Sequence, residues 1–81
     1  MPVISRFEGI VIKMYFSQSE HDPPHIHVQY AEYSAVVEIE TGKILEGHLP
    51  IKQEKKVTEW TKENKTKLEE MWKTKIITKI E

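Results

Sequence analysis

The stretch HIHVQYAEYSAVVEI, residues 25–39, decides the fold because it contains two strands and the turn between them. Residues 25–30 alternate polar with apolar side chains, and residues 33–39 carry an apolar side chain at every second position. This period of two is typical of half-buried strands. The two residues in between, Ala31 and Glu32, predict a tight turn and hence an antiparallel hairpin.

A two-residue turn also predicts the register of the hairpin. Tyr30 would lie opposite Tyr33, so that the apolar side chains of both strands share one face. On the other face His25 would lie opposite Glu38, with His27 two residues along the same strand. Directly opposed side chains have Cβ atoms about 5 Å apart. Two imidazoles and one carboxylate therefore converge in this register.

Further strands are predicted on both sides of this hairpin. Residues 9–16 are rich in β-branched and aromatic side chains, and residues 43–49 follow a Thr-Gly turn, so both read as strands. Polar residues and two prolines make residues 17–24 a loop. The short connections favour an antiparallel meander of about four strands.

From Pro50 onward the hydrophobic period changes to that of a helix. The helical stripe extends over residues 50–73, and a proline suits the first turn of a helix. Trp60 and Trp72 lie on this stripe, and we interpret them as anchors in the core. Asn64 lies on the same stripe and needs a hydrogen-bond partner if it is buried.

We therefore expect one α+β domain over residues 1–81, with an antiparallel meander of about four strands and one long C-terminal helix packed on one sheet face. The histidines would lie on or beside the other face. The pattern of the tail, residues 74–81, leaves three structures open: an extension of the helix, an edge strand or a frayed end.

The composition restricts the classes of function. The formal net charge is −1, which argues against strong nonspecific binding to nucleic acid. The chain has no cysteine, so disulfides, thiolate catalysis and cysteine-ligated zinc are excluded. No apolar stretch approaches the ~20 residues of a membrane helix, and no signal peptide is evident. We predict a cytoplasmic protein that does not enter a membrane.

The segment HDPPHIHV, residues 21–28, holds three of the four histidines of the chain. Three imidazoles, from His21, His25 and His27, together with Glu38 or a water molecule, would make an ordinary zinc site. Nickel, copper or iron suit the same donors. The sequence thus predicts one divalent metal ion as a candidate cofactor.

Two alternatives use the same residues without a metal. His25 or His27 could act as a general base, and Arg6, the only arginine of the chain, could stabilise charge that develops on a phosphoryl group. In the other alternative the histidines are structural or form an interface for another protein. The residues alone leave these three interpretations open.

Several segments resemble one protein family. They are ISRFEGIVIKMYF, HDPPHIHVQYAEYSAVVEIETGKILEGHLP, and a helix with VTEW and a later tryptophan. From about residue 2 to residue 72 the chain resembles the bacterial family catalogued as domain of unknown function 4160. The residues that match its recurring positions are Arg6, Gly9, His21, Pro23, Pro24, His25, His27, Glu46, Gly47, Pro50 and Trp60. The resemblance does not predict a histidine at His48, and the lysine- and isoleucine-rich tail is unlike the family's ends.

The resemblance implies a role but no mechanism. Members of this family look like small bacterial proteins that are often encoded beside another small protein, of the family catalogued as domain of unknown function 2442. That arrangement is similar to a toxin–antitoxin pair. We therefore expect one member of a two-gene module, the toxin-like half, with the neighbouring protein as its partner and RNA as a candidate target. This expectation comes from gene arrangement alone.

Overall fold

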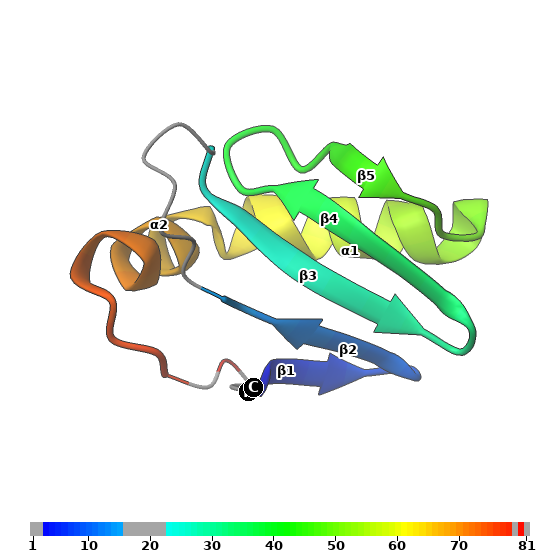
Figure 1. Cartoon of the computed structure of the whole chain (residues 1–81), viewed down its shortest axis with the longest axis horizontal. Coiled ribbons are helices and arrows are strands. Elements are labelled where there is room, and N and C mark those ends of the chain that lie inside the picture. Colours follow the sequence, from blue (N-terminus) through cyan, green and yellow to red (C-terminus); the bar gives the residue numbers. More distant parts are fainter. Residues whose placement is uncertain (1–2, 16–22, 79, 81) are drawn as a thin grey trace.

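The computed structural model describes residues 3–15, 23–78 and 80. Within these ranges five strands form one antiparallel sheet in the order β1-β2-β3-β4-β5, and two helices follow (Figure 1). The strands are β1 (Val3–Phe7), β2 (Ile10–Lys13), β3 (His25–Tyr30), β4 (Tyr33–Glu38) and β5 (Ile44–Gly47). The helices are α1 (Ile51–Glu63) and α2 (Lys65–Thr74). The predicted α+β class and antiparallel meander are confirmed.

The β3–β4 hairpin has the predicted register. Tyr30 pairs with Tyr33 and His25 pairs with Glu38, so the apolar side chains of both strands share one face. Ala31 begins the turn with a φ of 51°, in the left-handed region that tight hairpin turns use. The alternating pattern therefore determines which side chains face the core and which face outward.

The prediction of about four strands was wrong by one, because β1 precedes them. A β-bulge between Val3 and Ser5 interrupts the pairing of β1 with β2, so polar and apolar residues do not alternate along it. A strand of five residues with a bulge gives no period-two signal in the sequence. Near the end of the tail, Ile80 donates its backbone N–H to the Ile4 carbonyl at 2.7 Å, so the tail contacts this strand.

The single predicted helix over residues 50–73 was also wrong, because it is divided at Asn64. The Asn64 backbone has φ −107° and ψ 14°, outside the range of a helix interior. Its side chain donates from Nδ2 to the Trp60 carbonyl at 2.9 Å, which is the partner that the sequence analysis required. Asparagine side chains compete for backbone groups in this way and suit helix interiors poorly.

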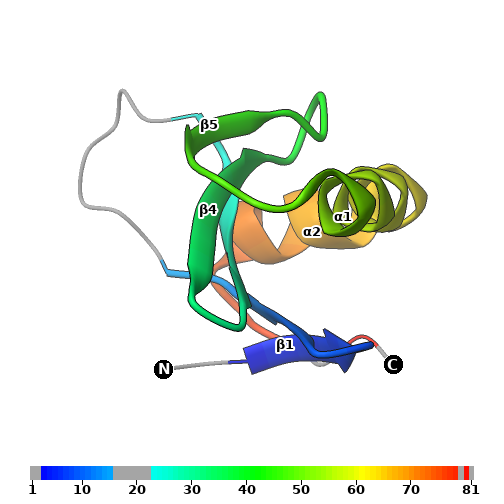
Figure 2. The same ribbon diagram turned by 90° about the vertical axis from the view of Figure 1, so that its right-hand side faces the viewer.

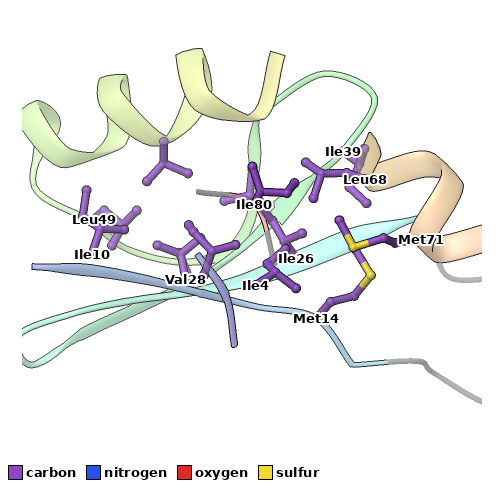
Figure 3. Packing of buried hydrophobic residues seen from close by; sticks show 14 residues of the cluster. Ile4, Ile10, Met14, Ile26, Val28, Ile39, Leu49, Leu68, Met71 and Ile80 are labelled. Carbon is purple, nitrogen blue, oxygen red and sulfur yellow. The ribbon is translucent and has the colours of Figure 1, made fainter. Parts of the chain in front are cut away.

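Both helices cover the same face of the sheet (Figure 2). Buried apolar side chains, Leu68 and Met71 of α2 among them, point into the layer between the sheet and the helices (Figure 3). Val57 is the buried apolar residue that α1 contributes to this core. Trp60, interpreted as a core anchor, is half-buried and stacks on Phe7 with 5.9 Å between ring centroids. Neither of the described helices has the length and hydropathy needed to cross a membrane.

Polar contacts hold α1 against the turns of the sheet. Thr58 donates its hydroxyl to the Gly42 carbonyl at 2.9 Å, and Lys56 forms a salt bridge with Glu8, with 2.6 Å between Nζ and Oε1. The salt bridge is partly exposed and contributes less than about 1 kcal/mol. Thr61 of the same helix differs, because its hydroxyl is fully buried and makes no hydrogen bond to the described residues.

Replacing Thr61 by valine is expected to stabilise the protein. Valine has the shape of threonine and removes a buried hydroxyl whose missing hydrogen bond costs about 1–3 kcal/mol. Urea unfolding should show a free energy of unfolding that is higher by about 1 kcal/mol. The matched control is Thr58→Val, which removes a hydrogen bond that is made and should lower this free energy by about 1 kcal/mol. Equal losses in both variants would show that the Thr61 hydroxyl has a partner.

The pairing of β5 with β4 is irregular and depends on Gly47. Val36 pairs with Glu46, but Val37 pairs with Ile44, because a bulge shifts the register between them. Beyond the bulge Gly47 lies so close to β4 that an added Cβ would overlap the Ser34 carbonyl oxygen. Its φ of 84° also lies in the region that favours glycine. Gly47 therefore allows the end of β5 to approach β4 closely.

Gly47→Ala is expected to destabilise the protein more than Gly9→Ala. Both glycines have positive φ, which costs another residue about 1–3 kcal/mol. At Gly9 an added Cβ would lie 3.3 Å from the Tyr30 ring, which can shift, whereas at Gly47 it would meet backbone atoms. Thermal unfolding of the two variants measures the difference. Similar melting temperatures would contradict the close approach of β5.

Candidate functional site

The outer face of the sheet, opposite the helices, carries a row of paired side chains from β2 to β5. Lys13 pairs with His27, His27 with Val36, and Val36 with Glu46. We call these four residues the central row. In β2, β3 and β4 they alternate with buried residues of the core, so they point away from the helices. The row thus places an ammonium group, an imidazole and a carboxylate across one sheet.

A hollow of about 270 Å³ lies over the central row. Besides the row, the hollow is lined by Tyr15, Gln29, Ser34 and Gly47 among others. Its volume is just below the usual range of small-molecule pockets, so it suits one small group of a larger ligand. Because Gly47 has no side chain, the β5 side of the hollow stays open.

His27 lies at the centre of the row and in contact with two other rings. The Tyr15 ring meets it edge-on, with 4.5 Å between ring centroids, and the His25 ring lies 5.2 Å away. Burial lowers the pKa of His27 from its ordinary value of 6.5, His25 lowers this pKa further, and Glu46 opposes both effects. His27 is therefore neutral at pH 7 and can accept a proton.

His25 lies at the start of β3 and is oriented by the backbone. Its Nδ1 is 2.8 Å from the Pro23 carbonyl oxygen. Because a carbonyl only accepts, we assign the proton to Nδ1, which leaves Nε2 unprotonated in the neutral ring. The Trp72 ring of α2 lies 5.0 Å from the His25 ring. Trp72, interpreted as a core anchor, thus also contacts His25.

The predicted metal ligands are only partly brought together. His25 and Glu38 are cross-strand neighbours, but Glu38 accepts a hydrogen bond from the Thr41 hydroxyl at 2.6 Å. No group of three or more His, Cys, Asp or Glu side chains suited to a metal occurs within residues 3–15, 23–78 and 80. His21 lies outside the described residues. A metal site that His21 completes beside His25 and His27 stays a prediction.

Arg6, predicted to assist the histidines, does not line this hollow. It pairs with Val11 and is exposed. It lines a different hollow, of about 690 Å³, which is also lined by Trp60 and Asn64. Lys13 is instead the cation that the sheet places directly opposite His27.

Lys13, Tyr15 and Glu46 are site residues that the sequence analysis missed. Glu46 lies within the predicted strand over residues 43–49, but it was not assigned to the histidine-bearing face. Lys13 stands among alternating apolar residues, which assigns it to the outer face. Its partner could not be predicted, since a long connection between β2 and β3 sets no register.

The fold and the site define a small α+β protein with a polar, histidine-bearing sheet face. The family model described as Domain of unknown function (DUF4160) matches residues 9–73, which is most of the chain, and the protein belongs to this family. The matched range contains the whole central row as well as His25. No curated protein and no solved structure matches the chain significantly.

Proton NMR titration of the histidine rings tests the surroundings of His27. The midpoint of the His27 titration should lie below 6.5, because burial and His25 disfavour the charged form of the His27 ring. The unfolded chain then binds more protons than the folded one, so the free energy of unfolding should fall as the pH decreases below 6.5. His27→Gln should remove this part of the pH dependence. A His27 midpoint at or above the ordinary value would contradict the described burial.

Proposed function

We propose that this protein is a metal-independent ribonuclease and the toxin-like half of a two-gene module. The observation that carries the proposal is the central row, in which Lys13 lies directly opposite His27 under a hollow on the outer face. A neutral imidazole beside a cation suits the cleavage of RNA by its own 2′-hydroxyl. The net charge of −1 favours a substrate that is held by specific contacts over nonspecific binding.

In this reaction His27 takes the proton of a ribose 2′-hydroxyl while the 2′-oxygen attacks the adjacent phosphorus. The P–O2′ bond forms and the P–O5′ bond breaks, which gives a 2′,3′-cyclic phosphate and a 5′-hydroxyl. Lys13 stabilises the negative charge that develops on the phosphoryl oxygens. His25, with its ring centroid 5.2 Å from that of His27, acts in its doubly protonated form and supplies from Nε2 the proton that the departing oxygen takes up. One proton is removed and one is supplied, so no further reactant is consumed.

The toxin-like role and the partner rest on the family resemblance. The proposed partner is the small protein of a neighbouring gene, similar to domain of unknown function 2442, in a bacterial cytoplasm. A partner that covers the hollow over the central row would block the reaction. The alternative without catalysis is an adaptor, which would bind this partner and leave RNA intact.

Purified protein without a histidine tag should cleave single-stranded RNA in the presence of EDTA and leave 2′,3′-cyclic phosphate ends. Loss of the general base in His27→Ala should slow cleavage by about 10²–10⁴-fold, and Lys13→Met should slow it by about 10²-fold. His48→Ala is the matched control, because His48 packs on Tyr33 with 5.8 Å between ring centroids and should leave cleavage unchanged. Intact RNA under these conditions would contradict the ribonuclease proposal.

The same variants provide a second readout in cells. Induced expression of the wild-type chain should arrest growth, and co-expression of the neighbouring protein should relieve the arrest. His27→Ala should be harmless at the same level of folded protein. Normal growth with abundant, folded wild-type protein would count against the toxin-like role.

Metal binding is the second candidate function, and one observation favours it. Metal-bound histidines generally donate their other ring N–H to a carbonyl or carboxylate, and His25 makes such a bond to Pro23. His27 and His21 would complete the ligands. Mass spectrometry of untagged protein should then find about one equivalent of zinc or another divalent metal, which His25→Ala/His27→Ala loses and His48→Ala keeps. Metal-free protein after reconstitution with zinc, nickel and iron would rule this function out.

A further inference from the structure

We propose that the hollow on the outer face recognises guanine, with Glu46 as the specificity-determining residue. This inference rests on the proposed ribonuclease function and names its substrate class, single-stranded RNA that is cut on the 3′ side of guanosine. The base lies toward β5, the ribose 2′-hydroxyl lies at His27, and the 3′-phosphate lies toward Lys13.

Opposite charges lie at the two ends of the central row. Lys13 is on β2 and Glu46 is on β5, with His27 on a strand between them. Neighbouring strands are about 4.8 Å apart, so three such spacings separate the two backbones, and the side chains can contact opposite ends of one ligand. A suitable ligand has an anionic group at one end and N–H donors at the other. A nucleotide has its phosphate and its base in this relation.

A carboxylate at one end of the row can distinguish one base from another by its hydrogen bonds. The Glu46 carboxylate can only accept hydrogen bonds when it is ionised, and this carboxylate makes no hydrogen bond or ion pair with another described residue. Guanine presents its N1–H and its N2 amino group side by side, so both can bond to the two oxygens of one carboxylate. Adenine and cytosine place an acceptor nitrogen beside their amino group, and uracil places its N–H between two carbonyl oxygens. Guanine is therefore the base that Glu46 favours.

Two further hydrogen-bonding residues lie beside the central row. Gln29 and Ser34 face each other across β3 and β4 and line the same hollow. An amide N–H and a hydroxyl can donate to the O6 and N7 acceptors of guanine. Gly47 adds no side chain over Ser34, so this pair stays accessible from β5. The hollow thus offers the acceptor, Glu46, and the donors, Gln29 and Ser34, that guanine requires.

Binding of the four nucleoside 3′-monophosphates tests this base preference separately from cleavage, because these product-like ligands cannot be cut. In EDTA, NMR titration of the wild type should show that guanosine 3′-monophosphate binds about tenfold more tightly than the other three. One bidentate contact between a side chain and a base, here the Glu46 carboxylate with guanine, gives a preference of about this size. Glu46→Gln should lose this preference, since its amide turns an N–H donor toward the donors of guanine. Glu40→Gln is the matched control, because Glu40 is exposed and does not line the hollow, and it should keep the preference.

Mapping the cut sites on an RNA of mixed sequence separates this inference from the proposed function. Preferred binding of the guanosine ligand together with intact RNA would support the guanine site and refute the ribonuclease function. His27-dependent cutting after all four bases, with equal binding of the four ligands, would overturn the guanine site and support the ribonuclease function. Failure of every monophosphate to bind would overturn the guanine site as well.

Discussion

The register of the β3–β4 hairpin is the constraint on which the rest of the structure depends. Ile26 and Val28 are fully buried under the helices, and burying such a side chain contributes about 1.5–3 kcal/mol. A slip of one residue would expose both side chains and turn His25 and His27 into the core. The same hydrophobic burial that stabilises the sheet therefore keeps the histidines on the outer face. In a domain this small, little other core is available to compensate for a different register.

The outer face obtains its charges from the strands on either side of this hairpin. β2 pairs with β3 so that Lys13 lies opposite His27, and β5 pairs with β4 so that Glu46 lies two strands beyond it. The second arrangement requires Gly47, because a side chain there would overlap the backbone of β4. The stability of the β4–β5 contact and the shape of the hollow therefore have a common cause.

Features set by local sequence could be predicted, and features set by distant contacts could not. The two-residue turn and the alternating pattern predicted the pairing of His25 with Glu38, because both lie within the hairpin sequence itself. The pairing of Lys13 with His27 depends on how a long connection folds back, so the sequence indicated the face of Lys13 but not its partner. The break at Asn64 was missed because the apolar stripe continues through it, although the need of its side chain for a hydrogen bond was recognised. The hydrogen bond from the Thr41 hydroxyl to Glu38 was not predicted, and Glu38 as a metal ligand stays a prediction.

The central claim is that the outer face, rather than the helices or a sheet edge, is the functional surface. The most direct measurement is mapping of backbone amide shifts in ¹⁵N-labelled protein on titration with a 2′-O-methyl RNA oligonucleotide in EDTA, because this RNA cannot be cleaved. The account predicts that the largest shifts fall on Lys13, His27, Val36 and Glu46 and their neighbours in β2 to β5. Shifts confined to α1 and α2, or no shifts at all, would contradict it.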